Sequence, residues 1–154
     1  MSRGMRPARW LTPIFESESP RAIRFSHQAL EAGLLGLMFQ NMAWLQNFPE
    51  TPPIYESGVR YVPEHPSFDK RTVGEDWKSI PYILKHGYGD CEDLASWRAA
   101  ELRMKGIPAR PIVKVRRLPS GAFRAHAIVG LPGGKTEDPS AKLGMYNYSA
   151  ALSR

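Results

Sequence analysis

Residues 87–106 read GYGDCEDLASWRAAELRMKG, and this stretch predicts a helix that begins at an acidic turn. Asp90 is a favourable N-cap residue, and Asp93 stands three residues later, as in a capping box. The residues that follow are mostly good helix formers, and Gly106 is placed to end the helix as a C′ glycine. This helix carries Cys91, the one cysteine of the chain, in its first turn.

Cys91 is surrounded by three acids, Asp90, Glu92 and Asp93. A thiol is a nucleophile only as the thiolate, and negative neighbours oppose the loss of its proton. The helix dipole and the free N–H groups of the first turn act in the opposite direction, and those N–H groups could also hold an oxyanion. Two interpretations therefore stay open: a nucleophile at a helix start, or a small buried residue behind an acidic cap.

The segments around this helix predict an α+β fold, with helices first and an antiparallel sheet after them. The two alternating segments 109–117 and 122–130 predict paired strands joined by the turn LPSG. The expected elements before them are a helix over about 19–46, a proline-rich connection over 50–75 with a short strand at 58–63, and a short helix over 76–87.

Length and composition predict one domain. The chain has 154 residues, 42% of them hydrophobic, which is enough for a core. We expect an extended basic arm over residues 1–18 and a single domain over 19–154, with its core at 76–140. One cysteine excludes an intramolecular disulfide and a cysteine-rich zinc site. Neither a secretory signal nor a membrane span is recognisable, so the expected location is the cytoplasm.

The net charge is +6, with basic residues in the N-terminal arm and between residues 98 and 124. A basic balance favours acidic partners or nucleic acid. The simpler interpretation is that these charges are the solvated faces of a helix and a strand, and nucleic acid is not the expected partner.

Two residues downstream complete a candidate catalytic set. His126 lies in the second predicted strand, and Asp138 follows a glycine-rich turn and is expected on the next strand. If the sheet packs on the helix, Cys91 could attack, His126 could carry the proton and Asp138 could orient the imidazole. Glu137 is the alternative acid. The spacing alone is a weak signal.

Four short segments resemble the transglutaminase-like superfamily: GDCEDLA (89–95), LRMKGIPAR (102–110), HAIVG (126–130) and EDPS (137–140). The order and spacing of these segments are similar to those of the family, over about residues 76–140. The GDCED form is most similar to bacterial transglutaminase-like cysteine proteases, which include short phage-encoded members.

The resemblance implies a papain-like fold, a protein or peptide substrate, and a thiol hydrolase in which Cys91, His126 and Asp138 form the triad. It also implies Asp90, Glu92 and Asp93 as calcium ligands, since acids near the cysteine bind calcium in some relatives, and a virion location if the protein is phage-encoded. The alternative is a catalytically silent adaptor of a phage or bacterial assembly, docking through residues 1–46.

The chain departs from the family pattern before Cys91. No Asn or Gln lies between Phe48 and Cys91, so neither the upstream asparagine ligand of the relatives nor a papain-type oxyanion glutamine is present there. The available substitutes are Asn47, Glu64 and Asp69 for the ligand, and Trp77 or Tyr88 for the oxyanion donor.

Overall fold

The computed structural model describes residues 20–63, 77–121 and 123–146. In chain order its elements are α1 (Pro20–Asn47), a 3₁₀ turn (Ile54–Glu56), β1 (Arg60–Tyr61), α2 (Ile80–His86), β2 (Tyr88–Gly89), α3 (Cys91–Met104), β3 (Arg110–Arg117), β4 (Phe123–Gly130), a 3₁₀ turn (Pro132–Gly134), β5 (Thr136–Glu137) and α4 (Pro139–Lys142). The expected arm over 1–18 and the substitutes Glu64 and Asp69 lie outside the described residues.

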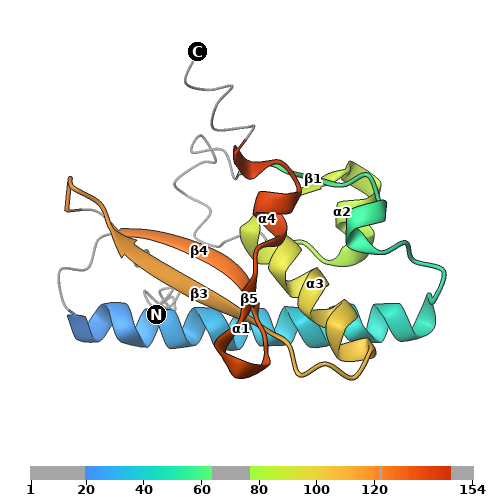
Figure 1. Ribbon diagram of the computed structural model, residues 1–154, viewed down its shortest axis with the longest axis horizontal. Helices are drawn as coiled ribbons and strands as arrows, with labels where there is room; N and C mark the ends of the chain where they lie inside the picture. Colours follow the sequence, from blue (N-terminus) through green and yellow to red (C-terminus); the bar gives the residue numbers. More distant parts are fainter. Residues whose placement is uncertain (1–19, 64–76, 122, 147–154) are drawn as a thin grey trace, which may run out of the picture.

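The sheet is antiparallel with strand order β3-β4-β5, and α3 packs against it (Figure 1). This arrangement confirms the predicted α+β class. One face of the sheet joins α1 and α3 in the core, where Val113, Ala127 and Val129 pack with Leu34 and Met38. Strand residues alternate between the two faces, so His126 lies on the other face. The packing thus leaves His126 on the side of the sheet away from α1.

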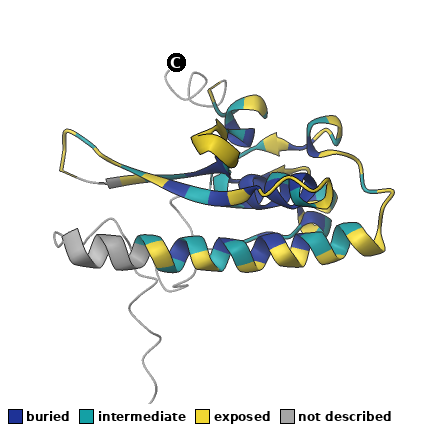
Figure 2. Cartoon of the chain, turned by 60° about the horizontal axis from the view of Figure 1, so that its bottom comes forward, coloured by how far each residue is buried: buried dark blue, intermediate teal, exposed yellow. Residues whose placement is uncertain are grey.

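The long helix α1 forms one layer beneath the sheet and α3, and only part of its surface is buried (Figure 2). Leu30, Leu34 and Met38 recur at every fourth position and face the core, as expected for an amphipathic helix. Gly33 allows a close approach, because a Cβ there would lie 2.3 Å from the ring of Trp77. The buried Asn41 uses its side-chain oxygen to accept a hydrogen bond from the Ile80 N–H at 3.1 Å. In this way α1 is tied to the start of α2.

None of the helices among the described residues has the length and hydrophobicity needed to span a membrane.

Both ends of α3 follow the sequence prediction. The Asp90 side chain accepts from the Asp93 N–H, and the Asp93 side chain accepts from the Asp90 N–H, which completes a capping box. At the other end Gly106 has a φ of 82°, and the Ile107 N–H bonds to the Leu102 carbonyl at 3.0 Å. A positive φ carries little cost for glycine, so this is the expected helix stop.

Two expected boundaries were wrong. The helix expected over 76–87 begins only at Ile80. Pro81 has no N–H to donate within a helix, so it fits in the first turn, and this places the start of the helix just before it. Asp138 is not on a strand: β5 ends at Glu137, and Asp138 is the N-cap of α4. Pro139 has no N–H to give to a sheet, but its fixed φ fits the first position of a helix.

Candidate active site

His126 and Asp138 are in direct contact. The Nε2 atom of His126 lies 2.9 Å from Oδ2 of Asp138, and both side chains are partly exposed. The second oxygen of Asp138, Oδ1, accepts a hydrogen bond from the Ala141 N–H at 3.1 Å and so caps α4. Because each carboxylate oxygen has its own partner, the acid is held in one orientation toward the imidazole.

Cys91 is the first residue of α3 and packs beside the strand that carries His126. Burial raises the pKa of the Cys91 thiol well above its ordinary value, and the charge of Glu92 raises it further. A hydrogen bond from the backbone of Ala127, the residue after His126, acts in the opposite direction. The thiol donates to Oε2 of Glu92 at 3.3 Å. The resting state is therefore a neutral thiol next to the His126 strand.

The three acids around Cys91 have different surroundings. Asp93 is fully buried and accepts the Lys78 backbone N–H at 2.7 Å, while the Lys78 ammonium lies 3.6 Å from its other oxygen. Asp90 is also buried, and Glu92 is half-buried beside the thiol. Asp93 is therefore engaged in contacts that stabilise the fold. Asp90 and Glu92 form a close pair of carboxyl groups beside the thiol.

Burial raises the pKa of Glu92 to about 8, with the charge of Asp90 as the next cause. Burial also raises the pKa of Asp90, and the charge of Asp93 is the next cause.

Within the described part of the chain no group of three or more His, Cys, Asp or Glu is arranged to hold a metal ion. Calcium takes six to eight oxygen ligands, and Asp93, one of the three expected carboxylates, is engaged in the helix cap. Calcium binding stays a prediction, and calorimetry on the wild type and on Asp90→Asn and Glu92→Gln tests it.

We expect Glu92→Gln to stabilise the protein at pH 8 and to have little effect at pH 5. The folded state holds the Glu92 proton up to about pH 8, whereas the unfolded chain releases it near the ordinary glutamate pKa of 4.5. The wild-type free energy of unfolding therefore falls as pH rises between these values, and a neutral amide removes that fall. The expected gain at pH 8 is about 2–4 °C in Tm, which corresponds to about 1 kcal/mol for a chain of this size.

Glu56→Gln is the matched control for this experiment, because it makes the same chemical change at an exposed glutamate. Thermal unfolding of the three proteins at both pH values is the measurement. A gain for Glu92→Gln that is equal at pH 5 and pH 8 would contradict the predicted protonation state.

Tyr61 is a site residue that the sequence prediction missed. It lies in β1, whose backbone pairs with β2 just ahead of Cys91. Burial raises the pKa of the Tyr61 hydroxyl to about 12, and the charges of Cys91 and Asp90 are the next causes, so the hydroxyl is within electrostatic range of the thiol. Tyr88, one of the two expected oxyanion donors, is exposed on β2. No sequence signal links Tyr61 to Cys91, because a short parallel strand pair brings them together.

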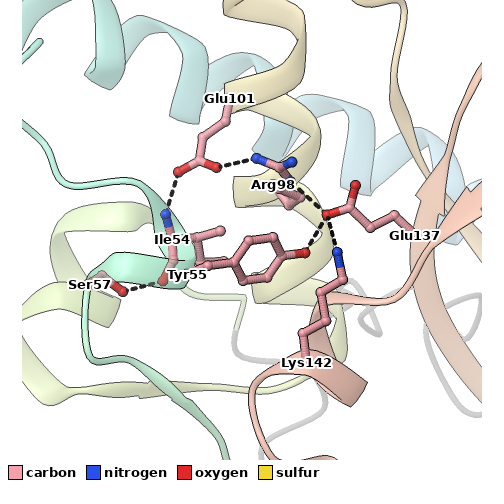
Figure 3. Close-up of polar contacts among 7 residues, drawn as sticks. All are labelled: Ile54, Tyr55, Ser57, Arg98, Glu101, Glu137 and Lys142. Atoms are coloured by element: carbon pink, nitrogen blue, oxygen red, sulfur yellow. Dashed lines mark hydrogen bonds and ion pairs between the residues drawn. The ribbon is translucent and has the colours of Figure 1, made fainter.

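Glu137 belongs to a second polar cluster next to Asp138, shown in Figure 3. Its Oε1 accepts from the Arg98 Nε at 2.8 Å and from the Tyr55 hydroxyl, with the Lys142 ammonium at 3.4 Å. Arg98 also bonds Glu101 at 3.1 Å. Arg98 and Glu101 come from α3, so the cluster joins the Cys91 helix to the segment that carries Asp138. Glu137, the alternative acid, is turned to this cluster, and Asp138 is the acid that contacts His126.

We expect Arg98→Ala to lower the free energy of unfolding by about 2 kcal/mol, because the change leaves two largely buried carboxylates without their main cation. Glu137 and Glu101 are 13% and 9% exposed at their side chains. Lys142→Ala is the control in the same cluster, since the Lys142 side chain is 56% exposed, and exposed ion pairs contribute about 0–1 kcal/mol. Urea unfolding compares the two variants, and equal losses would show that Arg98 has no special role in joining the two segments.

Comparison with known families identifies the chain. The family model of the transglutaminase-like superfamily matches residues 56–135, just over half of the sequence. The chain belongs to the transglutaminase-like superfamily. The matched region of this transglutaminase-like chain contains Cys91 and His126, whereas Asp138 follows its end. No curated protein and no solved structure matches the chain. The comparisons thus show the superfamily and no particular subfamily.

Proposed function

We propose that this transglutaminase-like chain is a thiol hydrolase that cleaves a peptide or amide bond through an acyl-enzyme on Cys91. The observation that supports this most is the 2.9 Å contact between His126 on β4 and Asp138 at the start of α4, with Cys91 packed against the same strand β4 at Ala127. The Nε2 atom of His126 is engaged by Asp138, so Nδ1 is the nitrogen that remains to take a proton. An Nε2–H that donates to the carboxylate leaves Nδ1 as an acceptor.

In the proposed reaction the Cys91 sulfur attacks the substrate carbonyl, and His126 removes the thiol proton as the S–C bond forms. The raised pKa of the thiol makes this simultaneous transfer the expected route, rather than attack by a preformed thiolate. The tetrahedral intermediate collapses as His126 returns the proton to the leaving amine. Water, activated by His126, then cleaves the thioester and restores the thiol. An amine in place of water would give cross-linking; the GDCED form and small size favour hydrolysis.

Iodoacetamide alkylation of Cys91 between pH 5 and pH 9 tests this proposal. In the proposed reaction His126 assists loss of the thiol proton, so His126→Ala should slow alkylation near pH 7 by about 100-fold, the lower end of the range for a positioned base. The same rate and pH profile in both proteins would refute a catalytic pair of Cys91 and His126.

The alternative function is a catalytically silent adaptor of an assembly that uses the same fold. The hydrogen bond from the thiol to Glu92, together with the raised thiol pKa, favours an inert Cys91. Such an adaptor would dock through residues 1–46, of which the structure describes only residues 20–46. Alkylation that is slow and insensitive to His126→Ala would support this alternative.

A further inference from the structure

Three cations share the face of the sheet that carries His126: Lys114, Arg116 and Arg124, here called the cationic ridge. In the antiparallel register Lys114 is directly opposite His126, and Arg116 is directly opposite Arg124. Opposed residues point to the same face, and so do residues two apart on one strand. The ridge thus begins at His126 and continues along the hairpin, which projects from the body of the molecule (Figures 1 and 2).

The ridge is an unfavourable arrangement for the sheet itself. Like charges directly opposite each other on paired strands are destabilising, and Arg116 and Arg124 form such a pair. All three side chains are exposed, and none makes an ion pair with an acid among the described residues. A solvated strand face could carry acids and bases alternately at lower cost. No acid among the described residues offsets this repulsion, so an anionic group bound at the ridge would relieve it.

The ridge lies partly on β4, the strand against which Cys91 packs at Ala127. Besides burial and the charges of Cys91 and Asp90, which raise the pKa of Tyr61, the charge of Arg124 acts on the same hydroxyl in the opposite direction. Tyr61 is therefore within electrostatic range of both Cys91 and Arg124. A chain bound across the site would meet carboxyl groups at the thiol and cations beyond His126.

We propose that the cationic ridge binds acidic side chains of a polypeptide substrate next to the amide that Cys91 attacks. This inference rests on the proposed function and names the substrate class for the same site. Alternate residues of an extended strand are about 6.6–6.8 Å apart. A substrate in extended form could thus place acids at every second position against Arg124 on one strand, and against Lys114 and Arg116 on the other.

An acidic polypeptide fits the ridge better than nucleic acid does. The ridge has three cations, it is confined to two strands, and it ends at the candidate active site. Proteins that bind nucleic acid through its backbone commonly make about 6–10 phosphate contacts, more than this face offers.

The inference is tested on the full chain by comparing the rates at which differently charged peptides label Cys91. The probes are three iodoacetyl-capped peptides, Gly-Glu-Gly-Glu, Gly-Gln-Gly-Gln and Gly-Lys-Gly-Lys. In each labelling the Cys91 sulfur displaces iodide, with loss of the thiol proton to base. Mass spectrometry gives the rate for each probe at about 0.01 M salt, where the Debye length is about 30 Å, and at about 1 M salt, where it is about 3 Å.

At low salt we expect the acidic probe to label about tenfold faster than the neutral one, the lower end of electrostatic steering in clefts. High salt should reduce this ratio to about one. Arg124→Glu should reduce the ratio in the same way, and it should also raise Tm, because it converts a like-charged cross-strand pair into an opposite pair. Arg110→Glu is the matched control: Arg110 is an exposed cation of the same β3 face, but it lies opposite Gly130, away from His126.

A ratio of about one in the wild type at low salt would overturn the inference, and so would an equal loss of the ratio in Arg110→Glu and Arg124→Glu. Adding a single-stranded DNA oligonucleotide decides the other class of partner. If the oligonucleotide binds through Arg124 while the acidic probe gains nothing, the ridge serves nucleic acid and the inference is wrong. The proposed function fails separately, through iodoacetamide rates that His126→Ala does not change, whatever the peptide ratio is.

Discussion

His126→Ala is expected to slow turnover of p-nitrophenyl acetate, a model acyl donor, by about 100-fold or more, the range of positioned acid–base catalysis. The burial that raises the pKa of the Cys91 thiol leaves few thiolates near neutral pH, so attack depends on a base that removes the proton during the reaction. His126, held at Nε2 by Asp138, is the base that the site offers. Release of nitrophenolate, followed by absorbance, measures the turnover.

His86→Ala is the control for this loss, because His86 is an exposed histidine of α2 that contacts the rings of Tyr82 and Tyr88. Its turnover should equal that of the wild type, and Cys91→Ala should show none above the uncatalysed rate. Turnover that persists in Cys91→Ala would show that the ester reacts elsewhere. Equal losses in both histidine variants would contradict a specific role for His126.

Asp93→Ala is expected to lower the free energy of unfolding by about 3 kcal/mol, within the range for breaking a buried ion pair. Asp93 is fully buried and accepts the backbone N–H groups of Lys78 and Asp90, with the Lys78 ammonium at 3.6 Å. Alanine leaves these donors without their acceptor inside the protein, where water cannot replace it. Urea unfolding followed by circular dichroism measures the loss.

Asp90→Asn is the matched change on the other side of the capping box. Asparagine keeps a side-chain oxygen for the Asp93 N–H and is as good an N-cap as aspartate, so its unfolding free energy should change by less than about 1 kcal/mol. If the two variants lose the same stability, the Asp93 carboxylate acts only as a cap, and its contact with Lys78 contributes nothing.

The parts of the fold that were predictable depend on neighbours in sequence. The capping box at Asp90 and Asp93, the stop at Gly106 and the paired alternating strands each arise within a few residues, so their sequence pattern is enough. Asp138 was placed on a strand because the sequence does not show where β5 ends. The expectation of His126 with Asp138 came from the order of short segments, and their contact is found in the structure.

The remaining features depend on contacts between distant segments. Tyr61 reaches Cys91 through the parallel pairing of β1 and β2, and the Glu137 cluster joins residues that are 39 and 82 positions apart. Ion pairs and hydrogen bonds of this kind leave no periodic pattern in a sequence. The like-charged pair of Arg116 and Arg124 is similar, because each charge is ordinary in a strand and only the register makes the pair unusual.

The double use of the Asp138 carboxylate limits which residues this position can accept. Both oxygens act as acceptors, one for His126 and one for the α4 N–H of Ala141. An asparagine has one acceptor oxygen and an NH₂ donor, so with its oxygen capping α4 it would present a donor to His126 and could not accept the Nε2 proton, and glutamate is not among the favoured N-cap residues. The local geometry therefore restricts position 138 to aspartate, although the side chain is partly exposed and the family match ends before it.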